Sequence, residues 1–331
     1  MAIDMHAHFF TEHLVDALRS RTEQPMIIED GEDFIMVRAG DSKPLPKGFQ
    51  SIDKRLELMD SMGIDMAVHS IPGLFQIEGE PIEASLPLTR ANNDGVAAIH
   101  AAYPDRFAGF ALLPQADMDA AAEEFDRAMG LPGIIGAIVP GNGFLTLQSA
   151  QHFRPLFEVG NRHKAIILVH TGPLPGETLW PVIEDLDNRW IRQGTLDMQQ
   201  RLSANMITLC LTDFLDDYPD VTVMSHNLGG NIPFEVERMD HLVLALNPDE
   251  EPPSQRFRQT NILIDCNSLG ERCIERGVEV YGVDKIVYGT DGSAFSMDWS
   301  NKAIAAARID TADKRAILDG NAKTMLELRL N

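Results

Sequence analysis

The stretch Ala165-Ile-Ile-Leu-Val-His170 is a continuous apolar run that ends in a histidine, and Val221-Thr-Val-Met-Ser-His226 repeats this arrangement. Continuous apolar runs of this length are typical of strands that are buried on both faces of a parallel sheet. Six further runs of similar character occur along the chain. The eight predicted strands are Ala2–Met5, Met66–Ile71, Phe107–Leu113, Ile134–Val139, Ala165–Val169, Val221–Met224, Ile262–Ile264 and Ile286–Tyr288.

Helical stretches lie between most of these strands. The clearest of them are Ile52–Met62, Asn92–Ala102, Met118–Met129 and Thr311–Leu328. Strands that alternate with helices predict right-handed βαβ units and a parallel sheet. Since eight such strands are the number that closes a barrel, the sequence predicts an α/β fold of the (β/α)₈ TIM-barrel type.

Two connections are too long to be simple crossovers. Residues 9–64 contain Met26–Asp30 and Asp33–Arg38, which we expect to pair as a small hairpin around Gly31. Residues 171–220 contain Trp180 and a helix predicted through 196–216. In a barrel both insertions would emerge at the C-terminal face, where pocket walls belong. Because no linker-like segment divides the chain, we expect a single domain over 1–331 with a small β insertion within 9–64.

Composition restricts the partners. The 331 residues include 28 Lys and Arg against 50 Asp and Glu, a net charge of −22, and 44% are hydrophobic. The hydrophobic share is sufficient for a core and excludes general disorder. We expect no nucleic-acid or membrane partner, because both surfaces repel such an acidic protein. Three cysteines without a paired motif, and the lack of a leader pattern, predict a cytoplasmic protein.

Metal-binding residue types gather at the predicted strand ends. His6 and His8 are two residues apart in a strand, so their side chains point to the same side. His170, His226 and Asp291 each end another strand. A His-x-His pair alone arises often by chance, and an Asp after a strand is commonly a helix N-cap. The conjunction at one face of the barrel, where such folds place their chemistry, favours a metal site.

Several longer motifs resemble one known family. They are IDMHAHFF (3–10), RLELMDSMGIDMAV (55–68), ANND (91–94), YPDRFAGFALLPQAD (103–117), ILVH (167–170), YPDVTVMSH (218–226), YGTD (288–291) and DGNAKTMLEL (319–328). Together they resemble the amidohydrolase superfamily, in its amidohydrolase-related (amidohydrolase 2) decarboxylase branch. That branch includes 2-amino-3-carboxymuconate 6-semialdehyde decarboxylase and γ-resorcylate decarboxylase. The likeness extends over nearly the whole chain in the same order.

The resemblance implies a distorted (β/α)₈ barrel that holds one divalent metal ion. His6, His8, His170 and Asp291 match the family's ligand positions, and His226 matches its acid–base histidine. The double-histidine form is associated with zinc, and manganese is the alternative. The resemblance further implies that Asp291 shuttles a proton in catalysis and that the protein is a homodimer.

The number of metal ions follows from a missing lysine. Binuclear amidohydrolases bridge two ions with a carboxylated lysine at the end of the fourth strand. Here that strand reads GIIGAIVPGN, and no lysine occurs between Lys54 and Lys164. We therefore expect a mononuclear site.

The resemblance favours a metal-dependent, non-oxidative decarboxylase of an aromatic or conjugated unsaturated carboxylic acid. The alternative is a metal-dependent hydrolase or hydratase of a lactone, cyclic amide or conjugated diacid at the same site. A metal-containing binding protein without turnover is a third class, which the intact ligand set and His226 disfavour. The first two classes differ in the reaction: a decarboxylase releases carbon dioxide, whereas a hydrolase or hydratase adds water to the substrate.

Four side chains are candidates for binding the small carboxylic acid substrate: Lys43, Lys47, Trp180 and Arg238. The lysines align near an arginine of related decarboxylases, but they are equally well interpreted as solvated loop charges. The loop after His226 reads NLGGN where the family has three glycines, and Gly292-Ser293 replaces its usual sequence after Asp291. These departures in loops that face the pocket leave the substrate open.

Overall fold

Eight parallel strands form one sheet whose spatial order follows the chain. The computed structural model describes residues 2–30, 33–38, 41–45, 51–180, 182–267, 269–292 and 298–330. All eight predicted strands are present, with ends that differ by a few residues. They are β1 (Ile3–His8), β5 (Met66–Ser70), β6 (Phe107–Ala111), β7 (Ile134–Pro140), β8 (Ile166–His170), β9 (Thr222–Ser225), β10 (Ile262–Asp265) and β11 (Ile286–Val287).

The sheet curls so that its last strand meets its first. Beyond the end of β11, Gly292 forms a parallel bridge with Ala7 of β1. Backbone hydrogen bonds continue this seam on either side, from Met5 N to Tyr288 O at 3.0 Å and from Asp291 N to His6 O at 2.9 Å. The prediction of a TIM-type barrel is therefore confirmed, and the seam brings Asp291 beside the histidines of β1.

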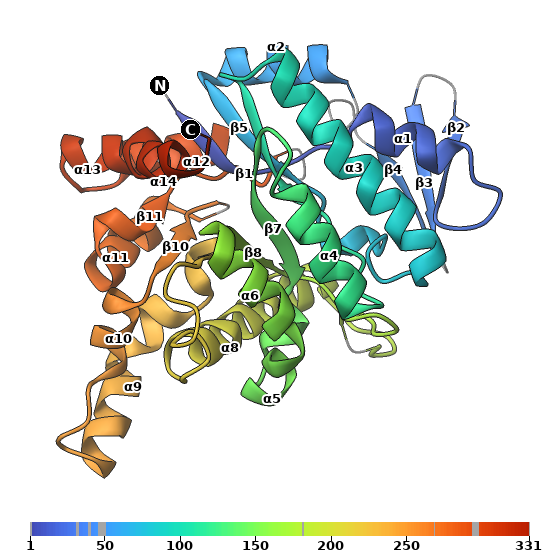
Figure 1. Cartoon of the computed structure of the whole chain (residues 1–331). Coiled ribbons are helices and arrows are strands. Elements are labelled where there is room, and N and C mark those ends of the chain that lie inside the picture. Colours follow the sequence, from blue (N-terminus) through green and yellow to red (C-terminus); the bar gives the residue numbers. More distant parts are fainter. Residues whose placement is uncertain are drawn as a thin grey trace.

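Helices surround the strands (Figure 1). They are α1 (Glu12–Arg19), α2 (Ile52–Met62), α3 (Ile82–Ala102), α4 (Met118–Ala128), α5 (Leu147–Ala150), α6 (Arg154–His163), α7 (Arg189–Ile191), α8 (Met198–Cys210), α9 (Ile232–Leu246), α10 (Pro253–Gln259), α11 (Glu271–Tyr281), α12 (Asp298–Ala306), α13 (Thr311–Arg315) and α14 (Asn321–Leu330). Three of them differ from the sequence prediction. α8 ends at Cys210, six residues before the end predicted at residue 216. α3 begins ten residues earlier than expected: it contains Pro87 in its second turn, where the proline removes one backbone hydrogen bond without ending the helix.

The predicted C-terminal helix is divided by a wider turn at Ala316–Gly320. The break has a local cause. Asn321, the first residue of α14, donates its side-chain amide to the carbonyls of Val283 and Ile286, each at 2.7 Å. These bonds fix the start of α14 against the loop that leads into β11, and they hold the closing strand in place.

The insertion after β1 contains a three-stranded antiparallel sheet. Its strands are β2 (Met26–Asp30), β3 (Asp33–Arg38) and β4 (Asp41–Leu45). The predicted hairpin is confirmed by the pairing of β2 with β3. The third strand was not predicted, because its sequence DSKPL contains a proline and two charges. Among the described strands β4 pairs with β3 alone, and proline is tolerated in such an edge strand.

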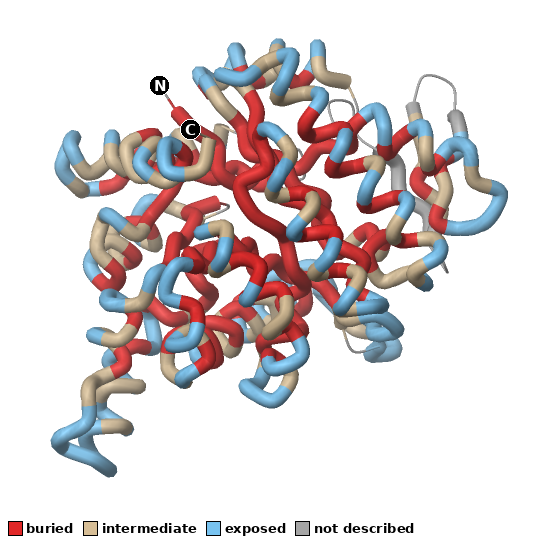
Figure 2. The backbone as a smooth tube through the Cα atoms, in the orientation of Figure 1, coloured by how far each residue is buried: buried red, intermediate tan, exposed pale blue. Residues whose placement is uncertain are grey.

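Buried residues concentrate in the barrel strands (Figure 2). Every described residue of β1, β6, β7, β8, β9 and β10 is buried, which explains why their sequences are apolar on both faces. Four of the buried polar residues are the last residues of their strands: His8, His170, Ser225 and Asp265. None of the helices in the described part of the chain combines the length and the apolarity that crossing a membrane requires.

Gly136 provides a test of the barrel. A Cβ atom at this position in β7 would lie 1.7 Å from the carbonyl oxygen of Ile166 in the neighbouring strand. Because that atom belongs to the backbone, Gly136→Ala must push β7 and β8 apart, and we expect a loss of about 3 kcal/mol or more of unfolding free energy. Gly270→Ala, where the new methyl group meets nothing within 4 Å, should change it by less than about 0.5 kcal/mol. Urea unfolding of both variants tests this, and equal stabilities would contradict the close pairing of β7 with β8.

Candidate metal centre

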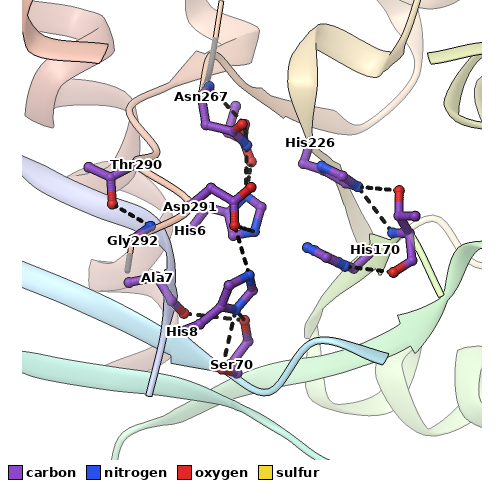
Figure 3. Close-up of polar contacts among 12 residues, drawn as sticks. His6, Ala7, His8, Ser70, His170, His226, Asn267, Thr290, Asp291 and Gly292 are labelled. Carbon is purple, nitrogen blue, oxygen red and sulfur yellow. Dashed lines mark hydrogen bonds and ion pairs between the residues drawn. The ribbon is translucent and has the colours of Figure 1, made fainter. Parts of the chain in front are cut away.

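Four side chains from three strand ends converge on one point. His6 and His8 belong to β1, His170 ends β8, and Asp291 follows β11. All four are buried, and their ligand atoms lie within 4.8 Å of one another. Figure 3 shows these side chains around a common space. The structure thus brings together the four residues that the sequence predicted as metal ligands.

Each of the three histidines is held through its Nδ1 atom, which leaves Nε2 turned toward the common space. A ring nitrogen beside an acceptor carries the proton, so the other nitrogen presents its lone pair. Such contacts fix both the tautomer and the orientation of metal-binding histidines. The three anchors are Asp265 Oδ2 at 2.7 Å from His6, Ser70 Oγ at 3.1 Å from His8, and Thr171 O at 2.9 Å from His170.

Two of the three inward-facing nitrogens make no hydrogen bond within the described part of the chain. Nε2 of His6 and of His170 are buried, and neither makes a hydrogen bond to any part of the chain that the structure describes. Nε2 of His8 lies 3.0 Å from Asp291 Oδ1. Two donors bound to one zinc ion are at most about 4.2 Å apart, so this set needs only a small contraction to enclose an ion. Buried lone pairs without a donor are costly, and a cation would satisfy them.

The backbone of Asp291 has the left-handed conformation, with φ of 53°. Aspartate is among the few residues with a Cβ that adopt it without great cost. Its amide donates to the carbonyl of His6 at 2.9 Å, so the same turn that closes the barrel directs the carboxylate at the histidines. Strained conformations of this kind persist where the surrounding structure enforces them.

Charges in the cluster favour a bound cation. Burial lowers the pKa of His8 and lowers that of His170 well below its ordinary value, so both rings are neutral. Burial opposes the charge of His6 too, but the contact with Asp265 raises the pKa of His6 to about 9. Although burial disfavours its charged form, the pKa of Asp291 is lowered by His8 and the other rings. A metal ion would replace the proton on His6 as the positive charge of the site.

Asp265 is a residue of the site that the sequence analysis missed. It ends β10, is fully buried, and accepts hydrogen bonds at Oδ1 from the backbone amides of Asn227 and Asn267 at 3.2 and 3.1 Å. The side chain of Asn267 also lies 2.9 Å from His6 Nδ1. The available signal was an aspartate at the end of an apolar strand, the same signal that identified Asp291.

His226 is placed differently from the three anchored histidines. Its ring stacks on that of His170, with centroids 4.3 Å apart and planes 8° from parallel. Nε2 accepts a hydrogen bond from the backbone amide of Thr171 at 3.0 Å, so this nitrogen points away from the common space (Figure 3). Burial holds the pKa of His226 well below its ordinary value. The ring is therefore a neutral neighbour of the cluster, and its acid–base role stays a prediction.

The predicted substrate-binding residues are only partly located. Trp180 lies half-buried in the insertion after β8, and Arg238 is exposed on α9 with no described contact to the cluster. The backbone of Lys43 pairs with Met36 in the small sheet, but its side chain and the whole of Lys47 lie outside the described residues. Substrate binding by these four residues stays a prediction.

Comparison with curated proteins finds relatives with two kinds of activity. A γ-resorcylate decarboxylase from Rhizobium sp. (strain MTP-10005) is 28% identical over 293 residues, which cover 83% of this chain and 87% of that protein. A 2-keto-4-carboxy-3-hexenedioate hydratase from Sphingobium sp. is 22% identical over 291 residues, 81% of this chain and 80% of the relative.

Solved structures share the architecture. One is the dihydroxybenzoic acid decarboxylase from Polaromonas sp. JS666, solved with bound manganese and the inhibitor 2-nitroresorcinol. It superposes with a TM-score of 0.75 at 21% identity, covering 99% of this chain and 97% of the other. The family model described as amidohydrolase matches residues 3–328, which include every strand of the barrel and all four members of the buried cluster. The chain belongs to this amidohydrolase family.

Proposed function

We propose that the protein is a metal-dependent, non-oxidative decarboxylase of an aromatic or conjugated unsaturated carboxylic acid. The observation that carries the proposal is the convergence of three Nδ1-anchored histidines and the Asp291 carboxylate within 4.8 Å. The similarity to a γ-resorcylate decarboxylase over most of both chains supports the reaction class. The proposed substrate is a small acid whose carboxyl carbon is attached to an aromatic or alkene carbon.

A divalent ion in this site would polarise a substrate oxygen and stabilise the negative charge that develops as the carbon–carbon bond breaks. The chain itself must position the acid and deliver a proton to the carbon that loses carbon dioxide. Asp291 is more accessible than the histidines of β1, with 12% of its side chain exposed against 2% or less for His6 and His8. We assign the proton transfer to Asp291: its carboxylate would take up a proton from the substrate acid or from water and pass it to the carbon, with His226 as the neighbouring base or stabiliser.

We propose a single ion and favour zinc. Three neutral imidazoles and one carboxylate form a donor set that suits zinc, although manganese also accepts these ligands and is bound by the Polaromonas structure. β7 ends in Val139 and Pro140 and provides no lysine for a second ion. The four ligand candidates are sufficient for one metal with a position left for substrate.

We also propose a homodimer in the cytoplasm. Apolar side chains stand exposed on the insertion between β8 and α8, including Trp190 at 84% and Ile191 at 63%. Such a surface is suited to contact with another copy. All three cysteines are free, as in proteins of a reducing compartment. A monomer in sedimentation experiments at micromolar protein concentration would contradict the proposed dimer. Recovery of the protein outside the cytoplasm after cell fractionation would contradict the proposed location.

The similarity to a hydratase supports one alternative to decarboxylation, which is the addition of water to a conjugated diacid at the same site. Metal-loaded protein incubated with carboxyl-¹³C-labelled acids, 2,6-dihydroxybenzoate first, separates the two reactions. The proposal expects labelled carbon dioxide that disappears when the metal is chelated. A hydrated product with the label retained would establish the alternative instead.

Metal binding should respond in a graded way to changes in the cluster. His8→Ala removes a ligand and should leave less than about a tenth of the wild-type metal content. Asp265→Asn leaves all four ligands in place but removes the anionic anchor of His6, so the affinity should fall by about 10- to 100-fold. Competition with a chelator measures both, and wild-type protein should retain one ion per chain. Two tightly held ions, or full occupancy in His8→Ala, would contradict the assignment.

Substitution of His226 tests whether this residue acts in the reaction or binds the metal ion. Since its Nε2 is engaged by Thr171, His226→Asn should keep the metal content and the fold. We expect kcat to fall by about 100-fold or more, because a positioned acid–base group contributes at least this much. Elemental analysis and turnover of the same preparation provide the comparison. Metal lost together with activity would make His226 a ligand, and unchanged turnover would leave it a structural residue.

A further inference from the structure

Helix α8 begins at the rim of the barrel mouth and runs along the outside of the barrel, where its last residues lie beside Val221 and Asn261, which precede β9 and β10. It packs on the turns η2 (Gly141–Phe144) and η5 (Asn227–Gly229), which follow β7 and β9 on either side of the strand that carries His170. Two residues of the helix show which face is turned inward. Met198 Sδ lies 4.0 Å from the Asn227 side chain, and the amide of Asn205 packs against Gly141.

Arg201 lies on this same inward face, three residues after Met198 and four before Asn205. Its Nη1 atom donates to Asn142 Oδ1 at 3.0 Å. Its guanidinium carbon lies 5.7 Å from the centre of the Trp180 ring. The indole and the Asn142 amide together hold the guanidinium plane at the mouth of the barrel.

The remaining N–H groups of Arg201 are not used by a carboxylate. Among the described residues, no acidic side chain lies within ion-pair distance of this arginine, although the chain carries 22 more negative than positive charges. Glu177, which shares the Asn142 amide with Arg201, is held instead by Asn142 Nδ2 and by the backbone amide of Leu174, at 3.0 and 3.1 Å. A half-buried guanidinium, fixed on one edge and one face, therefore presents a free edge that matches a carboxylate.

We propose that Arg201, Asn142 and Trp180 form a subsite for a second, non-reacting carboxylate of the substrate. The inference rests on the proposed function, in which the reacting carboxyl group lies at the metal centre. That group already has the metal ion as its positive partner, so a cation held at the rim of the mouth by Asn142 serves a different anionic group. The substrate class is therefore an aromatic or conjugated dicarboxylic acid, and Arg201 is a residue that determines specificity.

Binding of two simple acids tests the subsite without turnover. The probes are benzoate and benzene-1,3-dicarboxylate, titrated into metal-loaded protein by calorimetry. Wild-type protein should bind the diacid at least about tenfold more tightly than the monoacid. Arg201→Gln should abolish this preference with little effect on benzoate, and Arg201→Lys should restore only part of it, because an ammonium lacks the planar fork.

Arg192→Met is the matched control. Arg192 is an exposed arginine of the same insertion, paired with Asp187 at 3.0 Å, and its loss should leave the preference unchanged. Equal weakening of both acids in Arg201→Gln and Arg201→Lys would mean that Arg201 only supports the fold, and an undiminished preference would place the second carboxylate elsewhere. Either result overturns the subsite. The preference can survive even if no acid releases carbon dioxide, so failure of the subsite and failure of the decarboxylase assignment are distinguishable.

Discussion

The carbonyl of His6 is the point on which barrel and site both depend. It accepts the amide of Asp291 at 2.9 Å and so helps to join the last strand to the first. The same bond fixes the left-handed turn that brings the Asp291 carboxylate within 3.0 Å of His8. Closure of the barrel and assembly of the ligand set are therefore one event, and a change that opens this seam would be expected to disperse the cluster.

Burial explains why the cluster needs so many supporting contacts. A histidine in a buried site is costly unless both ring nitrogens have partners. The Nδ1 atoms find acceptors in Asp265, Ser70 and Thr171, which lie on or directly after three different strands. Only the Nε2 side is left for a metal, so the protein's own hydrogen bonds select the ligand atoms before any ion arrives.

Much of this arrangement could be predicted from sequence. Strand-end positions in a parallel barrel share one face, so the ligand types of His6, His170 and Asp291 sufficed to predict their convergence. Side-chain support was not predictable in the same way. Asp265 contacts His6 across 259 positions of sequence, and no local pattern encodes such a pair. Arg201 was missed because its helix carries no motif; its position at the rim of the mouth follows from tertiary packing alone.

The most direct test is a crystal structure of the metal-loaded protein with anomalous scattering recorded at the zinc and manganese edges. We predict one peak per chain, coordinated by Nε2 of His6, His8 and His170 and by the Asp291 carboxylate. His226 should remain outside bonding distance, still accepting from Thr171. A second peak in the barrel mouth, coordination through Nδ1, or a metal bound to His226 would contradict it.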